Sequence, residues 1–447
     1  MMDAQLAADI ARLALDRGAT DAECTLSEGD EFTARVRMRS LETLKEAGSQ
    51  AAGLRVLIGR RAGSAYTSDL TRDGIRQMVE SAVEIARVTS EDPFAGLPDE
   101  AELGAIPGDL ALYSDEVAAI DTQEKIDRAL AAEEAALGAD ARIVNSEGAS
   151  FDSWTGGHAF ANSRGFAGAY RRSSCSLSVT PVAKQNGSME RDYWLSRARA
   201  PRALESSADV GRKAAERALR RLGARKVQTA KVPVVFEPRT ARSLLGHVFD
   251  AVSGDTVYRT ASFLARRLGE KVASDQVTIV DDGTLPGLFG SSPFDDEGVP
   301  SRRTVVIERG VLKSWLLNTY TARKLGMKTT GNAARGIAGN AGVGHGNFFL
   351  EPGAKSEQEI VRGIARGLYV TELIGFGVNV VTGDYSRGAA GLWIENGEFA
   401  YPVSEITVAA NLLDMLKGIT LVANELEFRG STASPALVIG EMTVSGQ

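Results

Sequence analysis

Glycine is the residue type that most constrains how this chain can fold. The 447 residues include 47 glycines, whereas aromatic residues make up only 6%. Because glycine permits tight turns and weakens the interior of a helix, this balance favours many strands joined by turns over a helical bundle. The chain is also too long for one ordinary hydrophobic core, so we expect two or three domains.

The composition excludes several classes of protein. Hydrophobic residues at 43% and charged residues at 24% are typical of a soluble globular chain. The net charge of -7 argues against a nucleic-acid-binding surface, which needs clustered basic residues. No run of about 18 apolar residues occurs, so a membrane span is not expected.

The location that the sequence predicts is the cytoplasm. The first residues show the pattern of an amphipathic helix, without the basic stretch and apolar segment of a signal peptide. Cys24 and Cys175 lie far apart, and neither has a second cysteine or a histidine at metal-ligand spacing. Such cysteine usage is typical of a reducing compartment.

The N-terminal residues predict a compact α+β unit. A helix is expected between a cap at Asp3 and a stop at Gly18, and a second helix after a cap at Thr71. Between them, residues 31–38 alternate like a half-buried strand, and residues 54–58 predict another strand. The residues expected on one face of the first strand are Phe32, Ala34, Val36 and Met38.

The fold class that follows is α+β, in three parts. We assign an N-terminal α+β domain to residues 1–110 and a central α+β segment to residues 111–225. After residue 225 the chain changes to short apolar strands separated by glycine. Residues 226–447 are therefore expected to form a strand-rich domain resembling a barrel or a sandwich.

A helix predicted at residues 238–252 carries the strongest local candidate for a metal site. His247 and Asp250 are three residues apart, so both side chains can face one side, and Asp255 follows shortly after. A catalytic zinc ion normally takes three protein ligands, and the chain contains no H-E-x-x-H run. A histidine bonded locally at a helix boundary is the competing interpretation.

Two other stretches attract attention. Residues 335–347 are the most glycine-dense part of the chain, but no Gly-Lys-Ser/Thr follows. We therefore expect a flexible or close-packed loop beside a binding cleft and not a phosphate loop. The acidic runs 281–282 and 295–297 are expected to form turns that pair with Arg302 and Arg303.

Several runs together resemble the PmbA (TldE) branch of the TldD/PmbA peptidase family. The most specific is VTGDYSRGAAGLWIENG at residues 381–397, followed by Glu405-Ile406-Thr407. The other matching runs lie at residues 53–56, 65–70, 295–303 and 347–353. The resemblance spans nearly the whole chain.

The resemblance implies a partnership. In this family TldD is a zinc peptidase with an H-E-x-x-x-H helix and a later cysteine ligand, and it pairs with TldE. The pair is associated with cleaving unfolded peptides, maturing peptide antibiotics and degrading an antitoxin, and older names mention modulation of DNA gyrase. This chain departs from the TldD pattern, because the helix around Gly246 and His247 has no His-Glu pair and residues 428–435 contain no cysteine.

We therefore expect a subunit without a metal of its own, which helps to form the peptide cleft of a TldD-type zinc peptidase in a heterodimer, or of a homodimer. An extended peptide would add a strand to a sheet edge. The residues expected to contact it are Arg335, His345, Asn347, Asp384, Ser386 and Arg387. The alternatives are a metallopeptidase that uses His247 with Asp250 or Asp255, and a regulatory factor of the gyrase-modulator type that acts through protein contacts and not on DNA.

Overall fold

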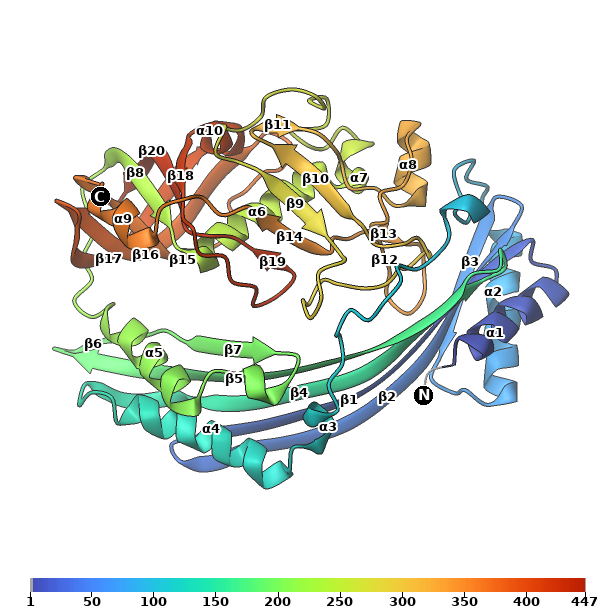
Figure 1. Ribbon diagram of the computed structural model, residues 1–447, viewed down its shortest axis with the longest axis horizontal. Coiled ribbons are helices and arrows are strands. Elements are labelled where there is room, and N and C mark those ends of the chain that lie inside the picture. Colours follow the sequence, from blue (N-terminus) through green and yellow to red (C-terminus); the bar gives the residue numbers. More distant parts are fainter. Residues whose placement is uncertain (1–2, 447) are drawn as a thin grey trace.

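The chain folds into a long N-terminal sheet and a C-terminal body that lies against one face of it (Figure 1). The structure is a computed structural model that describes residues 3–446. The strands of the N-terminal sheet are β1 (Asp21–Arg37), β2 (Ser40–Ile58), β3 (Arg61–Thr67), β4 (Ile143–Asn162), β5 (Ala167–Gln185), β6 (Ser188–Arg191) and β7 (Trp194–Ala198). Their order is β3-β2-β1-β4-β5-β6, and β7 pairs with β5. Because β1 pairs with β4, segments before and after residue 110 share one sheet.

Helices cover the other face of this sheet, at both of its ends. They are α1 (Ala4–Asp16), α2 (Arg72–Val88), α3 (Glu116–Ala119), α4 (Thr122–Leu137) and α5 (Ser207–Leu219), with short 3₁₀ turns at Glu100–Glu102 and Pro201–Ala203. The two predicted caps are present: the Asp3 carboxylate accepts a hydrogen bond from the Gln5 N–H, and the Thr71 hydroxyl accepts one from the Gly74 N–H.

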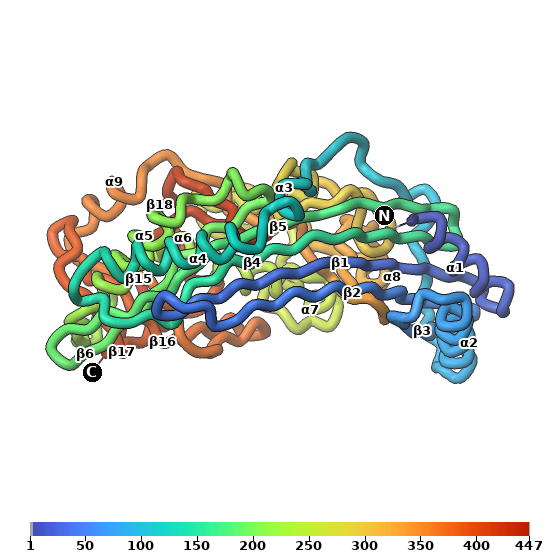
Figure 2. The backbone as a smooth tube through the Cα atoms, turned by 90° about the horizontal axis from the view of Figure 1, so that it is seen from below, coloured from blue at the N-terminus to red at the C-terminus, as the bar shows by residue number. Residues whose placement is uncertain are grey.

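Successive side chains along each strand point to opposite faces of the sheet, so alternate residues pack against the helices and against the C-terminal body. Cys24 and Leu26 of β1 share a core with α1 and α2, and Val36 shares one with α4 and Phe151 of β4. Glu23 points the other way and contacts the C-terminal body. The molecule therefore has helices, a sheet and a C-terminal body in successive layers, and Figure 2 shows β1, β2 and β4 running side by side along its length.

The predicted strand at residues 31–38 is part of a much longer one. Phe32, Ala34 and Val36 are buried on one face as expected, but the prediction for Met38 was wrong. Met38 lies in the turn between β1 and β2, with a φ of 47° and 45% of its surface exposed. The hairpin turns before the apolar alternation ends, so the last apolar residue has no core to join.

The C-terminal body contains a closed five-stranded barrel, so the predicted α+β class with a barrel-like C-terminal domain is confirmed. The barrel strands are β8 (Ala230–Phe236), β15 (Arg366–Ile374), β16 (Asp384–Glu395), β17 (Glu398–Asn411) and β20 (Leu437–Ser445), and β18 (Ile419–Val422) adds to β20. Pairing of β17 with β20 closes the ring.

A second sheet of the C-terminal body faces the N-terminal sheet. Its order is β11-β10-β9-β14-β19. The bounds are β9 (Ile279–Asp282), β10 (Arg303–Glu308), β11 (Val311–Leu312), β14 (Asn347–Leu350) and β19 (Thr432–Ala433), beside the small ladder of β12 (Ala333–Ala334) and β13 (Gly342–Val343). The helices are α6 (Pro238–Val252), α7 (Gly254–Val257), α8 (Thr319–Leu325), α9 (Glu357–Arg362) and α10 (Leu412–Lys417).

The apolar face of α6 is buried in the largest core, between the barrel and the second sheet, with Phe249 partly buried against it. Leu244, Leu245, Val248 and Val252 are each at most 2% exposed. On the opposite, polar face of α6, Arg239 donates to Asp192 and to the Tyr193 carbonyl beside the N-terminal sheet. No helix within residues 3–446 is both long and apolar enough to cross a membrane.

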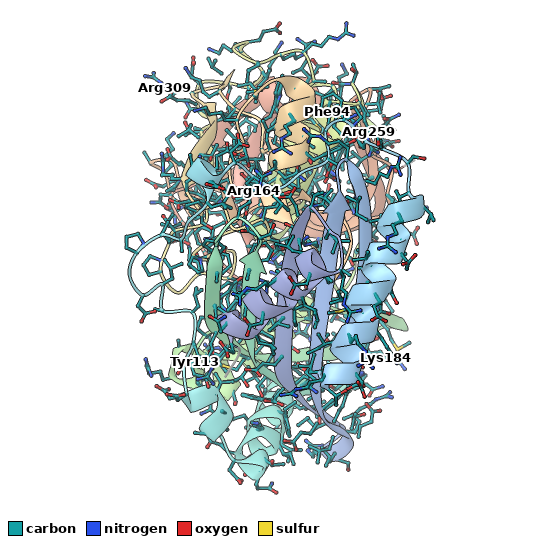
Figure 3. The ribbon with its side chains drawn as sticks, turned by 90° about the vertical axis from the view of Figure 1, so that its right-hand side faces the viewer. Phe94, Tyr113, Arg164, Lys184, Arg259 and Arg309 are labelled. Carbon is teal, nitrogen blue, oxygen red and sulfur yellow. The ribbon has the colours of Figure 1, made fainter. Side chains whose placement is uncertain are left out.

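The connection between α2 and α3 also links the two layers. Phe94 in this connection lies near the C-terminal body, on the same side as Arg259 (Figure 3). The Tyr320 hydroxyl donates to Asp92 at 2.9 Å, and Arg323 donates to the Leu97 carbonyl at 2.6 Å. These contacts hold the C-terminal body in one orientation over the sheet.

Candidate functional site

Several cavities lie between the N-terminal sheet and the C-terminal body, and two of them meet near the edge strand β19. The polar cavity has a volume of about 240 Å³, and the second, the arginine pocket, about 310 Å³. Ser431 borders the polar cavity, while Thr432, Ala433 and Ser434 border the arginine pocket. The two cavities are therefore neighbours at the edge strand β19 and the residue before it.

Acidic groups dominate the polar cavity. Asp281 of β9 is 3% exposed; its Oδ2 accepts a hydrogen bond from the Asn332 side chain at 2.7 Å. Its Oδ1 is buried and has no hydrogen-bond partner among the described residues. Because burial disfavours the charged form, the pKa of Asp281 rises to about 7. The wall of the cavity thus contains a carboxyl group that is readily protonated and has one unpaired, buried oxygen.

A second carboxyl group lies in the same wall. Asp295 accepts backbone hydrogen bonds from Glu297, Val299 and Ala333. Burial and the neighbouring Glu297 carboxylate raise the pKa of Asp295 to about 8, although the three backbone donors act to lower it. The acidic runs were expected to form turns paired with Arg302 and Arg303, and this was wrong: Asp281 and Asp282 belong to strand β9, and Arg303 pairs with Glu351. Within residues 3–446, Arg302 forms no salt bridge with either acidic run.

Basic and aromatic side chains complete the polar cavity. Tyr170 and Arg172 reach it from β5, and His345 from the C-terminal body. His345 bonds through Nδ1 to the Gly346 carbonyl at 2.8 Å and through Nε2 to the Thr432 hydroxyl at 3.3 Å. Burial lowers the pKa of His345, so the neutral imidazole is favoured. The arrangement can bind polar, uncharged groups such as peptide amides.

The loop at residues 335–347 is locked against the N-terminal sheet. Arg335, whose side chain is 3% exposed, pairs with Glu23 of β1, and Arg55 of β2 pairs with the same carboxylate at 2.8 Å. Burial opposes ionisation of Glu23, but the two guanidinium groups hold its pKa below the ordinary value. A Cβ on Gly53 would lie 1.4 Å from the Ile337 carbonyl oxygen. The predicted packed loop therefore fits directly onto the sheet.

The six residues predicted to contact a peptide do not come together. His345 lines the polar cavity, and Asn347 braces its floor by donating to the Asp282 carbonyl and the Ser291 hydroxyl. Arg335 instead forms the buried ion pair with Glu23 of the N-terminal sheet. The remaining three residues lie on β16 and line neither cavity; they are Asp384, Ser386 and Arg387.

The three alternative metal ligands do not form one cluster. His247 and Asp250 lie one turn apart on α6, and the buried Nε2 of His247 has no hydrogen-bond partner among the described residues. Asp255 instead accepts a hydrogen bond from the Val343 N–H at 2.9 Å. No three His, Cys, Asp or Glu side chains within residues 3–446 are arranged to hold a metal ion. The donor set therefore does not fit a zinc ion with three protein ligands.

Five arginines line the arginine pocket, and none of them was predicted from the sequence as a site residue. They are Arg217, Arg220, Arg239, Arg242 and Arg429. The local signal was present for two, because Arg239 and Arg242 are three apart at the start of a helix and so share one of its faces. The contribution of Arg217 and Arg220 at α5 has no local signal, since it depends on how the two layers pack.

Known proteins resemble this chain over almost its full length. Family models described as domain 1, the central domain and the C-terminal domain of PmbA/TldA metallopeptidases match residues 22–86, 115–222 and 229–446. Metalloprotease PmbA of Escherichia coli O157:H7 is 41% identical over 97% of this chain and 94% of its own length. A Metalloprotease TldD homolog of Buchnera aphidicola is 25% identical, with coverage of 84% and 79%.

Solved structures share the fold. A Bacteroides thetaiotaomicron protein described as a candidate modulator of DNA gyrase superposes with a TM-score of 0.92 and 30% identity, covering 99% of this chain and 98% of its own. TldE of Thermococcus kodakarensis has a TM-score of 0.89 at 21% identity, with coverage of 99% and 100%. From the matched domains and the likeness to PmbA, this chain belongs to the TldD/PmbA metallopeptidase family, in its PmbA branch.

Proposed function

We propose that this chain is the PmbA/TldE-type subunit of a cytoplasmic TldD-type zinc peptidase, and that it helps to bind unfolded or extended peptides while the partner holds the zinc. Membership of the family supports the peptidase context. The observation that carries the assignment of roles is the donor set on α6. His247 and Asp250 have no third ligand beside them among the described residues, so they cannot hold a zinc ion in the usual way.

The position of β19 supports a role in peptide binding. This two-residue strand forms the edge of the second sheet and lines the arginine pocket, and Ser431 directly before it lines the polar cavity. An extended peptide that adds a strand at such an edge gains backbone hydrogen bonds that do not depend on its sequence. That mode of binding suits unfolded substrates of many sequences.

Co-expression with a TldD-type subunit from the same genome tests the proposal. We expect the two chains to copurify as a heterodimer that cleaves an unfolded test protein such as casein, while this chain alone is inactive and binds substoichiometric zinc. Elemental analysis and a peptidase assay, each with and without the partner, measure this. An isolated chain that is active and carries one zinc ion would refute it.

One observation favours a second candidate, a metallopeptidase in its own right. The buried His247 Nε2 lacks a hydrogen-bond partner among the described residues, and Asp250 lies one turn away. Burial, and to a lesser extent the Arg387 guanidinium, lowers the pKa of His247. The ring is therefore kept neutral, as a metal ligand requires. If this candidate is correct, His247→Ala removes both zinc and activity from the isolated chain.

A further inference from the structure

The arginine pocket is an unusual place to concentrate positive charge, because both layers of the protein contribute to it. Arg217 and Arg220 come from α5 and the residue after it, and Arg239 and Arg242 come from the first turns of α6. In Figure 1, α5 and β7 lie on one side and α6, β15 and β19 on the other. The charge therefore gathers at the boundary that a peptide beside β19 would follow.

Part of this charge is neutralised within the protein. Arg217 donates to Asp192 and Glu237, Arg220 donates to Glu237, and Arg239 donates to Asp192. Three guanidinium groups thus share two carboxylates. The Nε of Arg220 is buried and has no hydrogen-bond acceptor among the described residues. This group of ion pairs retains one excess positive charge and an unused donor.

Arg242 differs from the other four arginines. Arg429 pairs with Glu427 at 2.8 Å, but Arg242 makes no hydrogen bond, ion pair or ring contact with any described residue. It is half-buried and lines the pocket. Glu357, the remaining acid of the wall, accepts a hydrogen bond from the Tyr369 hydroxyl, and burial raises its pKa. Arg242 therefore has no internal counterion.

The other walls suit an organic anion. Trp194 and Tyr369 provide aromatic surface, and Pro238 and Ala433 provide small apolar surface. A cavity of about 310 Å³ with a few convergent polar groups is within the usual range for small-molecule sites. Planar guanidinium groups bind planar carboxylates through two parallel hydrogen bonds. A small apolar group that carries a carboxylate matches both the charge and the walls.

We propose that the arginine pocket binds the C-terminal carboxylate of a peptide, with Arg242 as the principal ligand and the terminal side chain against Trp194 and Tyr369. This inference rests on the proposed peptide-binding function. It also specifies the orientation of the bound peptide: a peptide along β19 would place its C-terminal end in the arginine pocket and its earlier residues toward the polar cavity. The bound class is then peptides with a free C-terminal end.

Binding of matched peptides to the full chain tests the site. The probe is a fluorescein-labelled hexapeptide of alanine and leucine, made as a free acid and as a C-terminal amide, with binding followed by fluorescence anisotropy. We expect the acid to bind at least about tenfold more tightly than the amide, as expected for a charge-assisted hydrogen bond. A third peptide, an amide with glutamate at its last position, separates the chain end from a side-chain carboxylate and should bind like the plain amide.

Variants locate the effect. Arg242→Gln should abolish the preference for the acid, and Arg242→Lys should retain part of it because the charge remains without the guanidinium fork. Arg266→Gln is the matched control: Arg266 is exposed, lies outside the pocket and should keep the full preference.

The outcomes separate this inference from the proposed function. Equal binding of the acid and the amide, binding of the glutamate amide as tight as that of the acid, or an unchanged preference for the acid in Arg242→Gln would overturn the carboxylate site. Failure of all three peptides to bind would also overturn the site, but not the proposed function, because in that function the TldD-type partner completes the cleft. A clear preference for the acid, combined with an inactive pair after co-expression, would overturn only the proposed function.

Discussion

The residue with the least ordinary chemistry in the polar cavity is Asp281. It lies in the middle of a buried sheet, with one oxygen bonded to Asn332 and the other unsatisfied among the described residues. An unpaired buried carboxylate is costly, so the group stays protonated at a pH where an ordinary carboxyl group is ionised. This cost in stability leaves a carboxyl group with one unpaired oxygen in the cavity wall.

Asp281→Asn should make stability less sensitive to pH. The folded pKa of about 7 lies above the ordinary value, so the native state binds more protons between pH 4 and 7, and stability falls as pH rises through that window. Between pH 5 and 8 this group should cost the wild-type protein about 2–3 kcal/mol of unfolding free energy. Urea denaturation at both pH values measures the difference. An equal loss in the variant would contradict the assignment.

At the scale of elements, helices were easier to predict than strands. The caps at Asp3 and Thr71 located α1 and α2 closely, because capping is a local interaction. In β2, residues 40–50 are mostly exposed and polar, so no apolar alternation marks them, and the strand was recognised only near residues 54–58. Pairing with β1 extends this strand, and such pairing cannot be read from local sequence.

The candidate site was predicted incompletely for the same reason. His345 lies in a glycine-rich run that is visible in the sequence, whereas Tyr170 and Arg172 reach the same cavity from β5, far away in the chain. No spacing within one segment can indicate that meeting. The resemblance to the family supplied the fold and the context but not these contacts.

Gly53→Ala tests the packing of the glycine-rich loop on β2. The added methyl group would overlap the Ile337 carbonyl, so the loop must shift, and we expect a loss of about 1–3 kcal/mol. Gly246→Ala on α6 is the matched control. Nothing lies within 4 Å of its added Cβ, so better helix propensity should stabilise the protein by about 0.5–1 kcal/mol. Chemical denaturation compares the two, and equal effects would contradict the close approach.

At the scale of the whole molecule, a buried ion cluster joins the two layers. Glu23 of the N-terminal sheet pairs with Arg335 of the C-terminal body and with Arg55 of its own sheet. The cluster is buried, so it is protected from screening by salt. It fixes the sheet and the body that enclose the two cavities.

Glu23→Gln should destabilise the protein by about 3 kcal/mol, because two buried guanidinium groups lose their counterion. Glu31→Gln, which breaks the exposed pair with Lys45, should cost less than about 1 kcal/mol. Scanning calorimetry of both variants measures the contrast. Equal melting temperatures of the two variants would contradict a stabilising role of the buried ion cluster.

The pairing of β1 with β4 has a consequence during protein synthesis. The partners Glu23 and Asn162 are separated by most of the first third of the chain, and β4 is made only after α2, the long connection and α4. Until then, the emerging β1–β2 hairpin presents a long unpaired edge, which favours association with other nascent chains. Chaperone protection on the ribosome should therefore matter more for this protein than for one whose neighbouring strands are adjacent in sequence.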